Sequence, residues 1–104
     1  MAYIETIQTA GGVLQADIAP LHGGMVAQLR LQGRRLLHLE ESALETAPMS
    51  AGGMPVLFPF PSKTREDRYE LDGSPYYMPM HGLLKNAAFA VKSRERNAIT
   101  LWME

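Results

Sequence analysis

The sequence contains no cysteine, and neither sign of charge is in excess. Without cysteine, disulfide bonds and thiolate chemistry are excluded, and a cytoplasmic setting is expected. Ten Lys and Arg residues are balanced by eleven Asp and Glu residues, which gives a net charge of −1. A nucleic-acid surface needs a basic patch, and the densest basic cluster, residues 94–96, contains a glutamate. No nucleic-acid partner is therefore expected.

Long hydrophobic runs are also missing. No segment approaches the roughly 20 apolar residues that span a bilayer, and residues 1–12 lack the basic start and apolar stretch of a secretory signal. No membrane partner is expected. What remains is a chain of 104 residues, 46% hydrophobic and 20% charged. These values predict one globular β domain over residues 1–104, with a thin core.

Apolar and polar residues alternate over much of the chain, as in half-buried β-strands. Three such runs are Leu14–Ile18, Met25–Leu31 and Arg35–Leu39. Glycine supplies the positive φ of a tight hairpin turn, so Gln32-Gly33 predicts a hairpin between the second and third runs.

Two further hairpins are predicted. Asp72-Gly73 is a strong hairpin signal, and it lies between Arg68–Leu71 and Ser74–Met78. Ala88–Ser93 and Ile99–Met103 form the other pair, joined by a short turn. The predicted fold class is all-β and antiparallel, with short connections.

The stretch between these hairpin regions breaks the strand pattern. Only Glu40–Ala47 has a sequence that suits a short helix. Farther along, Pro55, Pro59 and Pro61 remove backbone donors, which excludes an ordinary central strand. The apolar run Val56–Phe60 favours burial, so the cations that follow it are expected to be held in fixed positions.

Two motifs in order carry a family resemblance: GGMPVLFPFPSKTREDRYELDG at residues 52–73 and YYMPMHGLLKN at residues 76–86. They combine a Gly-Gly-x-Pro-hydrophobic stretch, a polar element with arginine, an Asp-Gly hairpin and a His-Gly motif. This combination resembles the aldose 1-epimerase (galactose mutarotase) family, including its sugar-phosphate epimerase relatives. Ala19–Gly24, which precedes a strand and Gly33, resembles the N-terminal strands of that family, so the resemblance covers essentially the whole chain.

The resemblance implies an antiparallel β-sandwich with a sugar in a cleft on one sheet, present here as an incomplete N-terminal part. The implied reaction interconverts the α and β anomers of a free aldose: a base takes the anomeric hydroxyl proton, an acid protonates the ring oxygen, and the opened ring closes on its other face. No metal or organic cofactor is implied. The family's second histidine and its glutamate base follow the His-Gly motif at a distance beyond Glu104, so complete catalysis by this chain alone is not expected.

The resemblance also assigns residues. His81 matches the histidine that contacts the sugar near the reacting centre, as a catalytic and substrate-binding residue. Lys63 stands where many relatives have a substrate-binding arginine, and it lacks the bidentate fork of arginine. Arg65 compensates if the loop is shifted. Lys85 stands where sugar-phosphate relatives carry arginine, so the small-molecule sugar is either free or phosphorylated.

Each of these residues also has a purely structural interpretation. His81 could satisfy backbone groups in a turn, and Lys63 and Arg65 could be solvated turn charges. The other histidines, His22 and His38, share no metal-ligand spacing with it, so no metal site is expected.

Other polar and aromatic residues are expected to be structural. Adjacent residues of an extended chain point to opposite faces, so Glu66 and Asp67 are expected at the surface and not as a paired acid and base. Most aromatic residues are expected in the core, although Tyr76 and Tyr77 must point apart.

A second function class fits the same sequence: a non-catalytic sugar-binding or assembly module derived from this fold. An incomplete sandwich exposes strand edges and one apolar sheet face, which favours a homodimer. A third interpretation is a structural β domain that shares the fold alone.

Overall fold

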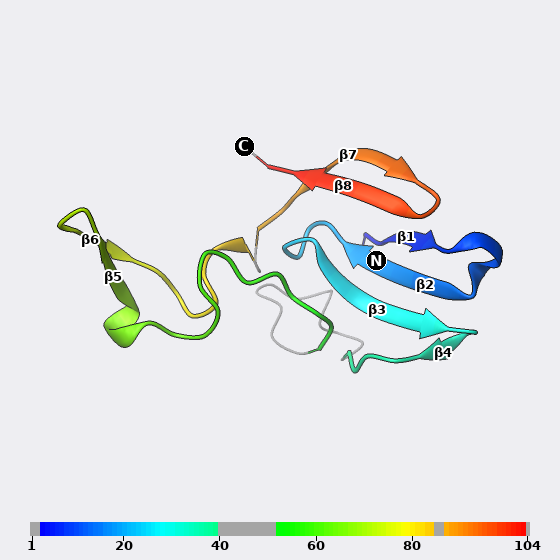
Figure 1. The fold of residues 1–104 in the computed structure, drawn as a ribbon, viewed down its shortest axis with the longest axis horizontal. Coiled ribbons are helices and arrows are strands. Elements are labelled where there is room, and N and C mark those ends of the chain that lie inside the picture. Colours follow the sequence, from blue (N-terminus) through cyan, green and yellow to red (C-terminus); the bar gives the residue numbers. More distant parts are fainter. Residues whose placement is uncertain (1–2, 40–51, 85–86, 104) are drawn as a thin grey trace.

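The computed structural model describes residues 3–39, 52–84 and 87–103. In these ranges eight strands form one four-stranded sheet and two hairpins, all paired antiparallel, within an elongated molecule of 53 × 28 × 22 Å (Figure 1). The predicted all-β, antiparallel fold class is confirmed. The strands are β1 (Glu5–Gln8), β2 (Leu14–Ala19), β3 (Met25–Leu31), β4 (Arg34–Arg35), β5 (Arg68–Leu71), β6 (Ser74–Tyr77), β7 (Ala90–Glu95) and β8 (Ala98–Trp102).

The four-stranded sheet has the order β1-β2-β3-β4. The strands predicted from alternation at residues 14–18 and 25–31 are confirmed as β2 and β3. Gln32 and Gly33 join β3 to β4 with φ values of 50° and 80°, the pair of positive values that a tight two-residue hairpin requires. The alternation did not predict β1, which pairs with β2 along its whole length.

The strand predicted at Arg35–Leu39 is wrong for most of its length, because β4 contains only Arg34–Arg35. Gln28 of β3 gives the physical reason. Its buried side-chain amide donates from Nε2 to the carbonyl of Leu37 at 2.9 Å, and its Oε1 accepts from the Leu37 N–H at 2.8 Å. The Gln28 side chain thus takes the place of a backbone partner for Leu37, so β4 ends while the N–H and the carbonyl of Leu37 remain hydrogen-bonded. The helix predicted at Glu40–Ala47 lies outside the described residues.

The two faces of this sheet differ in chemistry. On one of them Asp17 accepts a hydrogen bond from Thr6 Oγ1 at 2.8 Å and forms a bidentate ion pair with Arg30. Arg30 also donates to Gln15 at 3.2 Å, which extends the polar network along β2. The opposite side, called the apolar face below, carries Ile7, Leu14, Ala16, Leu29 and Leu31.

The ion pair changes the acidity of both partners. Partial burial opposes ionisation of Asp17, but the hydrogen bonds from Arg30 and Thr6 outweigh it and lower the pKa of the Asp17 carboxyl below its ordinary value. The hydrogen bond to Asp17 in turn raises the pKa of Arg30. Both groups are therefore charged at neutral pH.

A small core lies between β2, β3 and the start of the irregular segment, and its buried members are Ala19, Met25 and Ala27. Met54 pairs with Val26 of β3 through two backbone hydrogen bonds of 2.8 and 3.1 Å. The predicted burial of Val56–Phe60 is wrong: none of these five residues is buried, and Phe58 is 59% exposed. Backbone hydrogen bonds, and not a core, order this segment.

The β7–β8 hairpin is confirmed close to its predicted position and lies beside β1 (Figure 1). Polar contacts join it to β1. Arg94 Nη2 donates to the carbonyl of Thr6 at 2.6 Å, and Arg94 Nε lies 2.7 Å from a carboxylate oxygen of Glu5. The N–H of Gln8 donates to the carbonyl of Arg96 at 2.7 Å.

The β5–β6 hairpin is set apart from the other strands as an arm (Figure 1). Its Asp72-Gly73 turn is confirmed, with φ values of 52° and 81°. Tyr69 and Tyr76 stack across the two strands with ring centroids 5.4 Å apart, while Tyr77 is 75% exposed. The expectation that most aromatic residues would be in the core is wrong, because no aromatic residue of the described ranges is buried. Phe60 packs edge-on against Tyr69 with ring centroids 5.0 Å apart, yet none of the three rings is buried.

Candidate functional site

The arm joins the rest of the chain through a neck, formed by residues 58–62 and 79–83. Phe58 and Gly82 make an isolated parallel bridge, and the N–H of Leu83 donates to the carbonyl of Phe58 at 2.8 Å. Gly82 is buried with a φ of 82°, and a Cβ there would lie 2.0 Å from the Phe58 carbonyl oxygen. The His-Gly motif therefore needs its glycine so that the two backbones can approach.

His81 makes two hydrogen bonds to one residue across the neck. Its backbone N–H donates to the carbonyl of Ser62 at 2.8 Å, and its ring Nδ1 accepts from the Ser62 N–H, also at 2.8 Å. The ring is half-buried, and its Nε2 makes no hydrogen bond to the described part of the chain. One ring nitrogen thus closes the turn.

Lys63 is next to this contact in the chain but is already paired. Its Nζ lies 2.7 Å from Oδ1 of Asp67, and both side chains are about half exposed. Such a pair contributes little to stability, yet it neutralises the cation that the sequence assigned to the substrate. Lys63 therefore directly follows Ser62, the partner of His81, but its charge is compensated by Asp67.

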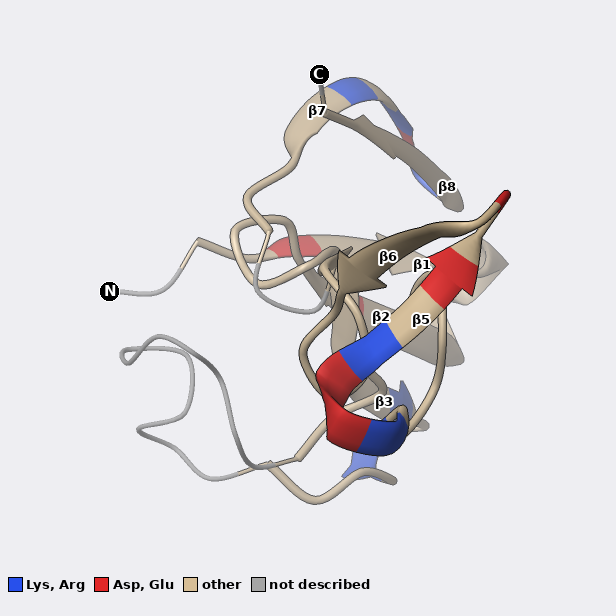
Figure 2. Ribbon diagram, turned by 90° about the vertical axis from the view of Figure 1, so that its left-hand side faces the viewer, with Lys and Arg blue, Asp and Glu red and all other residues tan. Residues whose placement is uncertain are grey.

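Arg65 lies in the short 3-10 turn η3 (Arg65–Asp67) that leads into β5. Basic and acidic residues are interspersed there and along β5 (Figure 2). A shallow hollow of about 340 Å³ beside it is lined by Arg65, Glu66, Arg68, Tyr69 and Glu70. Mixed charges of this kind do not favour a strongly anionic ligand over a neutral one.

Glu66 and Asp67 lie at the surface as expected, but the reason given, an extended chain, is wrong. Glu66 is exposed, but it and Asp67 have φ values of 57° and 55°, so the chain turns here and is not extended. Asp67 is held by Lys63 instead of pointing away alone. Lys85, the remaining predicted contact, lies outside the described residues.

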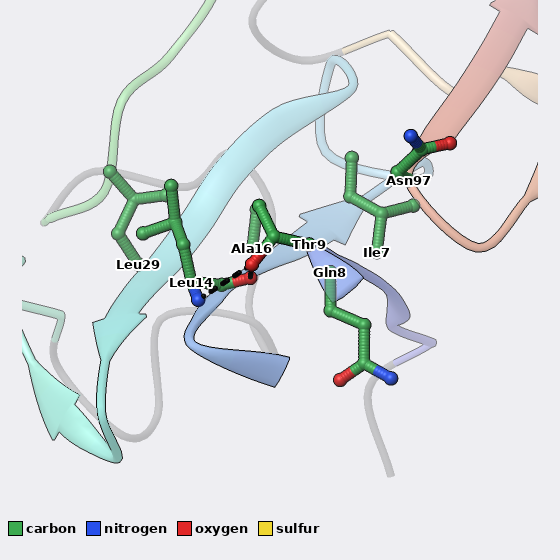
Figure 3. Close-up of a pocket in the computed structure, with 7 residues that line it drawn as sticks. All are labelled: Ile7, Gln8, Thr9, Leu14, Ala16, Leu29 and Asn97. Carbon is green, nitrogen blue, oxygen red and sulfur yellow. Dashed lines mark hydrogen bonds between the residues drawn. The ribbon is translucent and has the colours of Figure 1, made fainter. Parts of the chain in front are cut away.

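A second hollow lies on the apolar face, away from the neck (Figure 3). Its volume is about 160 Å³, and it is lined by Ile7, Gln8, Thr9, Leu14, Ala16, Leu29 and Asn97. It offers no titratable side chain, so acid–base chemistry has no support there. The neck carries the histidine, so it is the better candidate site.

The described residues also lack two features. Within residues 3–39, 52–84 and 87–103, no group of three or more His, Asp or Glu side chains could hold a metal ion. Over the same ranges, no helix is long and apolar enough to cross a membrane.

Sequence reasoning missed Ser62 and Asp67 as partners of the site residues. Serine at position 62 gave no signal, because its contribution is a backbone N–H that every residue except proline carries. The Lys63–Asp67 pair could have been found from its four-residue spacing, had a turn been expected there.

The fold has counterparts among solved structures. They include a protein from Synechocystis sp. PCC 6803 (TM-score 0.81, 21% identity, 91% of this chain and 33% of that chain). A galactose mutarotase-like protein from Lactobacillus casei has a TM-score of 0.74, with 22% identity over 95% of this chain and 32% of that one. A galactose mutarotase related enzyme from Lactobacillus acidophilus has a TM-score of 0.72, with 24% identity over 95% of this chain and 31% of that one.

Comparisons of sequence add nothing to this, since no family model and no curated protein matches the chain. The chain spans about a third of the length of the solved structures it resembles, consistent with an N-terminal portion. The resemblance seen in the sequence is confirmed at the level of the fold: the chain has the galactose mutarotase-like fold, as a portion of it.

Proposed function

We propose that this chain is the sugar-contacting part of a carbohydrate-active protein of the aldose 1-epimerase type, which interconverts the α and β anomers of an aldose. The observation that carries the proposal is the position of His81. In a fold shared with galactose mutarotase-like proteins, the histidine of the His-Gly motif is held by Ser62 on one ring nitrogen, and its other ring nitrogen has no hydrogen bond to the described residues.

Anomer interconversion needs one group that removes a proton and another that delivers one, both within hydrogen-bond reach of the sugar. His81 supplies one titratable group at the neck. No carboxylate of the described residues is hydrogen-bonded to it, so the second group is proposed to come from further polypeptide that completes the sandwich. Turnover by this chain alone is expected to be weak or absent.

Substrate contacts beyond His81 are proposed at Lys63, Arg65 and Lys85. Lys63 has to exchange Asp67 for a sugar hydroxyl or a phosphate, which the exposure of the pair permits. The mixed charges around Arg65 favour a free aldose over a phosphorylated one. No metal or organic cofactor enters the proposed reaction.

Sugar binding is tested by NMR titration of the labelled chain with galactose and glucose. Saturable shifts at the neck amides are expected, and they should vanish in His81→Ala but persist in His38→Ala. Equal shifts in both variants would remove His81 from the site. The same samples, mixed with freshly dissolved α-galactose and compared with buffer, report any acceleration of anomer interconversion.

A second candidate function, a non-catalytic module that assembles as a homodimer, is favoured by the apolar face. Leu14 is 39% exposed and Leu31 is 44% exposed, although both belong to a row of apolar side chains on a regular sheet. Burying them against a second copy would remove that area from water. Sedimentation at rising concentration should show a dimer that Leu31→Glu dissociates; a monomer throughout would contradict this candidate.

A further inference from the structure

Two residues at the neck adopt a backbone conformation that their side chains disfavour, and they contact each other. Ser62 and His81 have φ values of 64° and 67°, in the left-handed region that glycine prefers. Strained non-glycine residues persist only where surrounding contacts hold them, and they concentrate at functional sites. Here the holding contacts are the two reciprocal hydrogen bonds, each 2.8 Å long.

The direction of one of these bonds fixes the chemistry of the ring. A backbone N–H can only donate, so His81 Nδ1 must accept with its lone pair. A neutral imidazole has one protonated nitrogen and one acceptor nitrogen. When Nδ1 is the acceptor, the proton is on Nε2.

We propose that the backbone N–H of Ser62 is a positioning group that holds His81 as the Nε2–H tautomer, so that His81 meets the sugar as a hydrogen-bond donor. This inference rests on the proposed function for its ligand, but not for the tautomer itself. Nε2 then has no lone pair with which to take the anomeric proton. It donates to a sugar oxygen, either the ring oxygen or a hydroxyl, and the base of the reaction is a different group.

The side chain of Ser62 has no part in this arrangement. The hydroxyl makes none of the contacts to His81, and the residue is exposed. Ser62→Gly keeps the donor and suits a φ of 64°, so it is expected to leave the ring unchanged. His81→Asn is the complementary variant, because asparagine tolerates positive φ and offers an acceptor oxygen but lacks the Nε2 donor.

The test is NMR on the ¹⁵N-labelled chain at about pH 8.5, above the ordinary histidine pKa. A coupling through the hydrogen bond is expected between the Ser62 amide nitrogen and His81 Nδ1. The ring nitrogens should show one protonated and one unprotonated shift, in contrast to the averaged shifts of the urea-unfolded chain. His22→Gln and His38→Gln assign the signals. Absence of the coupling together with averaged shifts, or loss of the coupling in Ser62→Gly, overturns the proposal.

Addition of galactose then tests the donor role of His81 Nε2 separately from the fixed tautomer. A shift at His81 Nε2 larger than at Nδ1 is expected, and His81→Asn should lose galactose binding while its β5–β6 amide signals stay in place. If the coupling is present but galactose leaves Nε2 unchanged, the donor role and the sugar function are overturned, whereas the fixed tautomer stands. If galactose shifts the signals of a ring with averaged tautomers, the sugar function stands and the positioning role of Ser62 is overturned.

Discussion

The four-stranded sheet and the neck obtain their order in different ways. In the sheet, side chains supply it: an ion pair on one face, a buried amide at the edge and a small core of three buried residues at the end. In the neck, backbone groups supply it, through hydrogen bonds between two segments whose side chains are mostly exposed. The comparison teaches that the candidate catalytic histidine lies where backbone geometry, and not a hydrophobic core, holds the chain.

Gly82→Ala should have the largest effect on stability, because the new side chain would lie between the two backbone segments of the neck. The new Cβ would meet the Phe58 carbonyl oxygen at 2.0 Å, and alanine disfavours a φ of 82°. Overpacking and backbone strain together predict a loss of roughly 4 kcal/mol in the free energy of local opening. Hydrogen exchange at the amides of His81 and Leu83 measures this. Gly73→Ala is the control, since φ is 81° but no atom lies within 4 Å, so its cost should be only about 1–2 kcal/mol.

Gln28→Leu tests whether a side-chain amide holds the edge of the sheet. It leaves both backbone groups of Leu37 without their partner, which predicts a loss of about 2–3 kcal/mol in the free energy of unfolding. Urea denaturation measures the change. Gln8→Leu removes one side-chain hydrogen bond, the one to Gln15, and should cost less than half as much. Equal losses would mean that the Leu37 contacts do not stabilise the sheet.

Asp17→Asn tests how much the ion pair with Arg30 stabilises the sheet. Because the folded pKa of Asp17 is lowered, its ionised form stabilises the fold above the ordinary pKa of about 3.9, and this contribution is lost as pH falls through the lowered value. At pH 7 the free energy of unfolding of the variant should be about 2 kcal/mol lower than that of the natural chain. Between about pH 5 and pH 2 the stability of the variant should fall less than that of the natural chain. Asp72→Asn, at an exposed turn, should keep the natural pH dependence.

Thr64→Val should have the smallest effect and the opposite sign. Thr64 Oγ1 is buried and has no hydrogen-bond partner in the described part of the chain. Replacing it by a methyl group removes that penalty and should raise stability by about 1 kcal/mol. Thr9→Val is the matched control, because Thr9 Oγ1 accepts from the Leu14 N–H at 3.0 Å and its loss should destabilise. A loss in Thr64→Val would point to a ligand of the hydroxyl outside the described residues.

The sequence allowed prediction of the parts that side-chain periodicity specifies. β2, β3 and the hairpins at Gln32-Gly33 and Asp72-Gly73 follow from alternation and from glycine after a turn residue, because these patterns act over a few neighbouring residues. The β7–β8 hairpin follows from alternation alone, since its turn contains no glycine. β4 ended early because Gln28, nine residues away in the chain, competes for Leu37. No local pattern contains that information.

The sequence suggested candidate site residues, which stay predictions, but it did not suggest the geometry around them. His81 and Lys63 were identified by motif, whereas their partners Ser62 and Asp67 were not. The burial of Val56–Phe60 was predicted from composition and is wrong: Phe60 packs edge-on against Tyr69, yet none of the five residues is buried. Backbone donors and turn geometry depend on φ, which the residue types at these positions do not dictate.

The β5–β6 hairpin has a consequence for how the histidine finds its partner during folding. The contact between Ser62 and His81 joins residues 19 positions apart, and closing a loop of that length costs conformational entropy. The hairpin between them forms from local signals and brings the ends of β5 and β6 together, so only the short remainders on either side are left to close. The arm thus lowers the entropy cost of bringing Ser62 and His81 together, although neither residue belongs to its strands.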